Sequence, residues 1–153
     1  MQPETRYARL GDDRIAYQAL GQGPPDLVYS AGSFSHVDIV WEEPGLALFL
    51  RNLASFSRLI LFDRLGTGAS DPLPLHSLPP WESYAEELTA VLDEVGSEQA
   101  AIMARLDAGP MGLFFAGTRP NNTPPAATAR RLSLRRQLGR DDVDRLDHRW
   151  LLQ

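Results

Sequence analysis

The stretch that decides the fold runs from residue 58 to residue 71 and reads Arg58-Leu59-Ile60-Leu61-Phe62-Asp63-Arg64-Leu65-Gly66-Thr67-Gly68-Ala69-Ser70-Asp71. Its four large apolar residues, 59–62, lie between charged residues, which is typical of a buried strand. The chain must leave the core at Asp63 and Arg64, because both groups need partners or water. Gly66 and Gly68 then allow a sharp turn close to other backbone. We therefore expect a central strand followed by a turn in which Asp63 and Arg64 are structural.

Strand and helix patterns alternate along the rest of the first 118 residues. The expected strands are Thr5–Leu10, Arg14–Leu20, Asp26–Ser30, Leu59–Phe62 and Gln99–Met103, and the expected helices are Pro44–Phe56, Trp81–Val95 and Gly109–Gly117. The short polar link at residues 11–13 indicates a hairpin between the first two strands. This order predicts an α/β domain with a mainly parallel sheet, an N-terminal antiparallel hairpin and flanking helices.

The expected helix at Trp81–Val95 has an apolar stripe that includes Tyr84 and Leu88. Three glutamates, Glu82, Glu86 and Glu87, stand in its early turns. Acidic side chains in the first turns interact favourably with the helix dipole, and we interpret all three in this way.

Composition limits the function classes. The chain of 153 residues is long enough for one domain with a sizeable core. It has no Cys, which excludes disulfides and thiolate chemistry, and all 15 of its basic residues are Arg. The polar stretch at residues 1–13 does not resemble a signal peptide, and no apolar run approaches the length of a membrane span. We expect a cytoplasmic bacterial protein with no membrane partner.

Charge divides the chain near residue 118. Residues 1–118 hold 7 Arg and 16 acidic residues, a net −9, whereas residues 119–153 hold 8 Arg and 4 Asp, a net +4. The Asn and Pro cluster after Thr118 is typical of a loop, and the Arg-rich run at 130–140 has little apolar periodicity. We expect a domain at 1–118 and a tail at 119–153 with a flexible start and one possible short helix. The Arg run lacks interleaved aromatic residues, so we expect no nucleic-acid partner.

The segment Asp63-Arg64-x-Gly66-x-Gly68-x-Ser70-Asp71 resembles a motif of the α/β-hydrolase superfamily. The resemblance extends over roughly residues 5 to 120 and implies the opening half of that fold. The stretches Tyr7–Asp12, Ile15–Gln18 and Leu53–Arg64 are similar to a hydrolase-like subgroup whose members are sometimes fused to nucleotide cyclases. No cyclase-like sequence is present here.

The resemblance implies a nucleophile elbow, a small-x-nucleophile-x-small turn between the strand at Gln99–Met103 and the next helix. Two registers are possible. In the first, the elbow is Ala104-Arg105-Leu106-Asp107-Ala108, followed by Gly109, with small residues on both flanks but Leu106 at the tip. Leucine cannot act as a nucleophile. In the second, Asp107 is the nucleophile, which is chemically competent, but Arg105 stands where a small residue belongs. The continuation Gly109-Pro110-Met111 favours the first register.

The family's triad also needs an acid and a His after the elbow. After residue 109 the sequence offers His148, beside a cluster of Asp residues, and no strand pattern that would position them. The family forms part of its oxyanion hole in the loop after the third strand. Here that loop contains Gly32, Ser33 and His36, and the backbone N–H groups of Gly32 and Ser33 are candidate donors.

These features predict a truncated, catalytically impaired α/β-hydrolase-type protein. The resemblance implies a small apolar or ester-like ligand and no cofactor or metal. The alternative is a non-catalytic binding or regulatory module that retains the pocket of a hydrolase. The sequence does not determine an oligomeric state.

Overall fold

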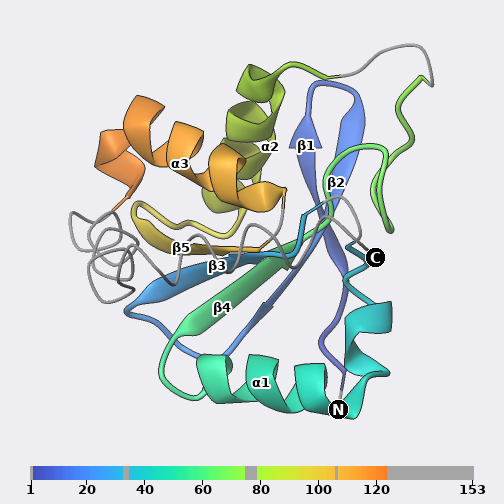
Figure 1. Cartoon of the computed structure of the whole chain (residues 1–153), viewed down its shortest axis with the longest axis vertical. Helices are drawn as coiled ribbons and strands as arrows, with labels where there is room; N and C mark the ends of the chain where they lie inside the picture. The colour runs from blue at the N-terminus through green and yellow to red at the C-terminus, as the bar shows by residue number, and fades with distance from the viewer. Residues whose placement is uncertain (1, 33–34, 75–78, 106, 124–153) are drawn as a thin grey trace, which may run out of the picture.

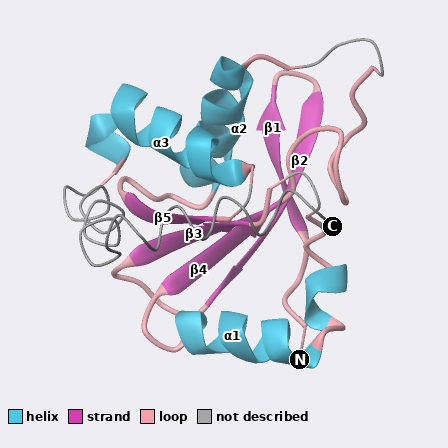
Figure 2. Ribbon diagram, viewed as in Figure 1, coloured by secondary structure: helices cyan, strands magenta, loops and turns pink. Residues whose placement is uncertain are grey.

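The structure is a computed structural model, and it describes residues 2–32, 35–74, 79–105 and 107–123. Its described elements form a sheet with helices on both faces (Figures 1 and 2). The strands are β1 (Arg6–Leu10), β2 (Asp13–Leu20), β3 (Asp26–Ser30), β4 (Arg58–Phe62) and β5 (Ala100–Ala104). The helices are α1 (Pro44–Ala54), α2 (Trp81–Glu94) and α3 (Ala108–Thr118), with short 3₁₀ helices η1 (Ile39–Trp41) and η2 (Pro120–Asn122). The α/β class predicted from the alternating patterns is confirmed.

The sheet has the order β1-β2-β4-β3-β5 and is mixed. β3 pairs in parallel with both β4 and β5, with Val28 opposite Ile60 in one pair and Ile102 in the other. The β1–β2 hairpin is antiparallel, and β2 joins β4 in antiparallel pairing. The expected N-terminal hairpin beside a parallel group of strands is therefore confirmed. All three parallel strands end at the same edge of the sheet.

The apolar stripes of the helices form two cores, one on each face of the sheet. α2 and α3 cover one face, where Leu88, Val91 and Phe115 are fully buried with Ile60 and Phe62 of β4. α1 covers the other face, and its buried residues Leu50 and Leu53 pack against the side chains of β3 and β4 that point to that side. Because successive residues of a strand point to opposite faces, the apolar run 59–62 serves both cores.

Local chemistry accounts for the start of α1 and the end of α2. α1 starts with Pro44 in its first turn, and the Glu43 carboxylate accepts hydrogen bonds from the backbone N–H groups of Gly45 and Leu46. This carboxylate satisfies donors that the helix itself leaves unpaired. α2 ends just before Gly96, whose φ of +62° suits the left-handed residue after a helix. No described helix has the length and apolar content required to cross a bilayer.

The sequence pattern predicted a flexible segment directly after Thr118, but the structure shows ordered residues there. Residues 120–122 form η2, and Thr123 after it is only 6% exposed. The Asn122 side chain also donates to the Glu98 carbonyl oxygen at 3.3 Å. The end of the polar Asn-Asn-Thr segment therefore packs against the domain through the Asn122 hydrogen bond and the burial of Thr123. The rest of the predicted tail lies outside the described residues.

Candidate functional site

Three loops meet at the carboxyl edge of the parallel strands. They follow β3, β4 and β5, and this edge is where open α/β sheets bind ligands. The Arg105 backbone N–H donates to the Ser30 carbonyl oxygen at 3.0 Å, which joins the ends of β5 and β3. The Ser35 hydroxyl donates to Asp63 at 2.7 Å, which joins the loop after β3 to the turn after β4.

Asp63 organises two of these loops. Its side chain is fully buried, and its carboxylate accepts from the Ser35 hydroxyl and from the backbone N–H groups of Val37, at 3.0 Å, and Ala69, at 2.9 Å. Gly68 allows this arrangement, because a Cβ there would collide with the Asp63 carboxylate and its φ is +53°. With these contacts, the carboxylate has a structural role in the turn.

The small-polar end of the motif attaches the turn to β2. The Ser70 hydroxyl accepts from the Ala16 backbone N–H at 2.8 Å. The Asp71 side chain pairs with Arg14 at 2.9 Å, and hydrogen bonds from Arg14 lower the pKa of the Asp71 carboxyl. The Gly66 N–H donates to the Asp71 carbonyl oxygen at 2.8 Å and closes the turn. Each polar position of the motif thus has a partner that holds the turn in place.

Arg64 is buried toward α2 and α3 rather than toward the site. Its Nε lies 3.7 Å from Oε2 of Glu87, which is fully buried. Glu87 is a residue that sequence reasoning misassigned: of the three glutamates assigned to the early turns, Glu82 and Glu86 are not buried but Glu87 is. Its position three residues after Tyr84 places it within the apolar stripe of α2, and this spacing is the signal that could have identified it.

The loop after β3 brings the predicted residue Gly32 to the edge of the sheet. Gly32 has a φ of +88°, a backbone conformation that residues other than glycine rarely adopt. His36 is half-buried, and its Nδ1 accepts from the Asp38 backbone N–H at 3.3 Å. One imidazole nitrogen therefore has a local partner within the loop. Ser33, the other candidate donor, lies outside the described residues.

The predicted elbow lies between β5 and α3. Ala104 is the last residue of β5, while Ala108 and Gly109 are buried at the start of α3. Asp107 precedes α3 with φ −65° and ψ −21°, an ordinary right-handed helical conformation, and its side chain is exposed. Leu106, the tip of the first register, lies outside the described residues.

Two contacts place the elbow relative to the other loops. A Cβ at Gly32 would collide with Oδ1 of Asp107, so the Asp107 carboxylate lies against the loop after β3. The Arg105 guanidinium donates to the Tyr29 hydroxyl at 3.0 Å while its side chain remains largely exposed. Arg105 therefore fits at the end of β5 because its side chain points toward Tyr29.

The part of the chain that the structure describes forms no nucleophile–His–acid triad at this edge. His148 and the Asp cluster beside it lie outside the described residues, as does His76. Among the described residues, no three His, Asp or Glu side chains form a group suited to a metal ion. The acidic group that lies against Gly32 of the predicted oxyanion loop is Asp107.

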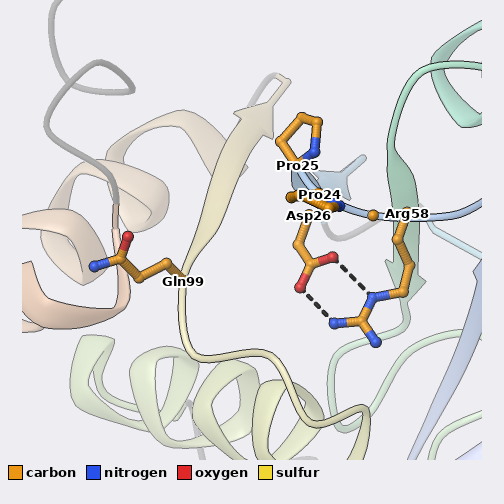
Figure 3. Close-up of a pocket in the computed structure, with 6 residues that line it drawn as sticks. Pro24, Pro25, Asp26, Arg58 and Gln99 are labelled. Atoms are coloured by element: carbon orange, nitrogen blue, oxygen red, sulfur yellow. Dashed lines mark hydrogen bonds and ion pairs between the residues drawn. The ribbon is translucent and has the colours of Figure 1, made fainter.

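A separate hollow of about 560 Å³ lies at the opposite, amino edge of the sheet. Figure 3 shows its lining, in which Asp26 and Arg58 form a bidentate pair with one contact of 2.8 Å. The Ser97 hydroxyl also donates to Asp26, Arg58 donates to the Val95 carbonyl oxygen, and Arg58 lowers the pKa of the Asp26 carboxyl. Its charged groups are thus engaged with each other. Together with its place at the amino edge, this makes it a weaker candidate than the carboxyl edge.

Comparison with known proteins adds evidence on the fold. No protein-family model and no curated protein match the sequence. Solved structures do match. A hydrolase from Pseudomonas aeruginosa PA01 matches 78% of this chain with a TM-score of 0.67 and 21% sequence identity. A carboxylesterase from Bacillus subtilis matches 80% of it with a TM-score of 0.63 and 22% identity, and the alpha/beta hydrolase domain-containing protein 10 from mouse matches 78% with a TM-score of 0.62 and 20% identity.

These likenesses show that the chain has the fold of an α/β-hydrolase over the matched region. The match spans 43%, 41% and 46% of the three structures, respectively. This chain therefore corresponds to less than half the length of the hydrolases that it resembles. At such low identity the likeness concerns the fold, and function must be argued from the site.

Proposed function

We propose that this chain is an α/β-hydrolase-type protein, similar to ester hydrolases, that does not perform serine-hydrolase catalysis. A small apolar or ester-like molecule is the proposed ligand at the carboxyl edge. The observation that carries the proposal is the elbow between β5 and α3, where Leu106 stands between the two small flanking residues Ala104 and Ala108. A tip without an oxygen nucleophile cannot form an acyl-enzyme.

The packing of β5 against α3 supports this register. A Cβ at Gly112 of α3 would lie 3.3 Å from the Ala104 Cβ and 3.3 Å from a methyl group of Ile102. The helix therefore crosses the strand closely, as an elbow with small flanking residues requires. The unstrained backbone of Asp107 also suits a residue that starts a helix, whereas the nucleophile of an elbow occupies a strained turn.

The position of Asp107 supports the proposal independently. An oxyanion hole stabilises negative charge with N–H donors. Here a carboxylate lies against Gly32 of the loop that would supply those donors. A fixed negative charge at this place opposes the build-up of a second one, so the transition state of ester hydrolysis is disfavoured.

The alternative is that Asp107 itself is the nucleophile. Its exposure at the carboxyl edge favours this candidate, because the carboxylate is accessible to a ligand. A carboxylate attacks without prior deprotonation, but the ester intermediate still requires a base that activates water. No described His stands after the elbow to supply it. Cytoplasmic location and bacterial origin remain part of the proposal; they rest on the Cys-free, Arg-only composition.

The test combines a covalent probe with an activity assay on the full chain. A fluorophosphonate should leave the protein unlabelled, and a chromogenic short-chain ester should not be hydrolysed above the buffer rate. Asp107→Asn should leave any residual signal unchanged, as should the control Asp93→Asn, an exposed aspartate on α2. A thermal shift with a non-hydrolysable ester analogue measures ligand binding separately.

The outcomes distinguish the readings. Stoichiometric labelling of a serine would overturn the non-catalytic assignment. Loss of ester hydrolysis in Asp107→Asn, with Asp93→Asn unaffected, would identify Asp107 as the nucleophile. A thermal shift without turnover supports a binding module. Absence of both turnover and thermal shift would contradict the ester-like ligand.

A further inference from the structure

Three buried polar side chains lie where α2 packs against the turn after β4. They are Arg64, Tyr84 and Glu87, here called the buried polar cluster. Arg64 is 7% exposed, and Tyr84 and Glu87 are fully buried. Charged groups at this depth are costly unless they are paired, so their arrangement requires an explanation.

The contacts of the cluster connect three elements. Glu87 Oε2 accepts from the Leu65 backbone N–H at 3.2 Å and lies 3.7 Å from Arg64 Nε. The Arg64 guanidinium carbon lies 5.4 Å from the centre of the Tyr84 ring, and Arg64 Nη1 lies 3.2 Å from the Met111 sulfur of α3. Arg64 thus links the turn after β4 to both α2 and α3.

The cluster is not fully hydrogen-bonded. Arg64 Nε, Tyr84 Oη and Glu87 Oε1 are buried and have no partner with hydrogen-bonding geometry in the part of the chain that the structure describes. Buried polar atoms in native proteins are nearly always paired, and the exceptions mark unusual groups. A carboxyl group with one oxygen engaged and one oxygen unpaired in a buried environment is poorly solvated as a carboxylate.

We propose that Glu87 is a buried proton switch: as a carboxylate it pairs with Arg64, and as a carboxylic acid it leaves Arg64 to Tyr84 and Met111. The proton comes from solvent and binds to a carboxylate oxygen. Because Arg64 also contacts Met111, the state of Glu87 is transmitted to α3, the helix that follows the elbow.

The surroundings of Glu87 support this assignment. Within the described ranges, the charged or titratable groups that face it are Arg64, from the turn after β4, and Tyr84, from its own helix. α3 contributes the uncharged Met111, and the carboxylate of Asp63 is engaged elsewhere, in the loop after β3. Burial raises the pKa of the Glu87 carboxyl, while the Arg64 guanidinium acts in the opposite direction.

The sign of the pH effect follows from this shift. The folded protein holds the Glu87 proton more tightly than the unfolded chain does. The contribution of the bound Glu87 proton to the stability of the folded state is therefore complete below the ordinary glutamate pKa, and it is lost as pH rises through the raised pKa of Glu87. Glu87→Gln removes this loss, so the melting temperature of the variant should rise relative to wild type as pH increases. Glu86→Gln, an exposed neighbour on the same helix, should show no such trend.

The decisive experiment is a carbon-13 NMR titration of the full chain that follows the glutamate carboxyl groups and the methionine methyl groups. Glu87 should titrate above the ordinary glutamate pKa, and the Met111 methyl signal should shift with the same midpoint. Met103 of β5 serves as an internal control and should not follow. In Glu87→Gln the Met111 shift should disappear, and in Glu86→Gln it should persist.

A Glu87 midpoint at or below the ordinary glutamate pKa would overturn the proposal, as would a Met111 signal that does not follow the Glu87 titration. If Glu87→Gln does not fold, the wild-type titration alone still decides, because the Glu87 midpoint and the Met111 response are both measured in the unmodified chain.

Discussion

Asp63 and Asp107 are both aspartates at the carboxyl edge of the sheet, yet their surroundings differ. Asp63 follows β4, is fully buried and accepts hydrogen bonds from three donors in two loops. Asp107 follows β5, is exposed and precedes a helix with an ordinary helical backbone. The sequence shows an acidic residue after an apolar strand in both places, and it is the burial of the side chain that distinguishes the two.

The difference separates a buried carboxylate from an exposed one in this fold. The Asp63 carboxylate is held in one geometry by its donors and is fully buried, so it is shielded from a ligand. The Asp107 side chain is exposed beside a left-handed glycine. Stability should therefore respond more strongly to Asp63 than to Asp107.

The largest effect is expected from Asp63→Ala. This substitution removes the acceptor of the buried Val37 N–H and of two partly buried donors, the Ser35 hydroxyl and the Ala69 N–H. An unsatisfied buried donor costs about 1–3 kcal/mol and a partly buried one less, so a loss of about 2–3 kcal/mol in the free energy of unfolding is expected. Urea denaturation of the full chain measures it.

Asp63→Asn provides the matched control for that prediction. The amide keeps one oxygen acceptor but places an NH₂ group against donors, so its destabilisation should be substantial and smaller than that of Asp63→Ala. An unchanged unfolding midpoint in Asp63→Ala would show that the carboxylate does not hold the two loops together.

A smaller effect is expected from Gly32→Ala, which tests how closely the two loops approach. The new methyl group would collide with the Asp107 carboxylate, and the φ of +88° is unfavourable for alanine. Left-handed backbone costs about 1–2 kcal/mol for a residue other than glycine, and the collision should add to this. Thermal unfolding of the full chain measures the total.

Two comparisons isolate the collision from the backbone term. Gly96→Ala places alanine at a φ of +62° with no atom within 4 Å of the new Cβ, so it reports the backbone term alone. In an Asp107→Ala background, Gly32→Ala should become less destabilising because the collision is removed. Equal effects of Gly32→Ala in both backgrounds would place Asp107 away from Gly32.

The turn after β4 could be predicted from sequence because its signals are local. The apolar run 59–62, the two glycines and the Ser-Asp end all lie within one short segment. In the structure the polar residues of the turn are hydrogen-bonded and its glycines are tightly packed. The order of strands and helices was also predictable, because periodicity is a property of each segment. Element ends differ by one or two residues, as hydrogen bonding at the termini requires.

The side-chain partners of Asp63 and Glu87 could not be predicted from the sequence, because they are long-range contacts. The partners of Asp63 include Ser35 and Val37, which lie 28 and 26 residues away, and no local pattern connects them. Burial of Glu87 depends on Arg64, 23 positions earlier in the chain, so a charge on an apolar stripe looked like an ordinary helix-start residue. The position of Leu106 at the tip of the elbow remains a prediction from the resemblance, because this residue lies outside the described residues.

The smallest effect on stability is expected from Asp107→Asn. The substitution preserves the shape of an exposed side chain and leaves the hydrogen bonds of Asp63 intact, so it should lower the free energy of unfolding by less than Asp63→Asn does. If Asp107 instead shared the role of Asp63, its destabilisation would equal that of Asp63→Asn. Urea denaturation of both variants under the same conditions decides between these readings. A near-neutral Asp107→Asn beside a strongly destabilised Asp63→Asn means that the fold does not require this carboxylate. Any change that Asp107→Asn then causes in ester binding reports on the ligand site itself, because the scaffold around it is intact.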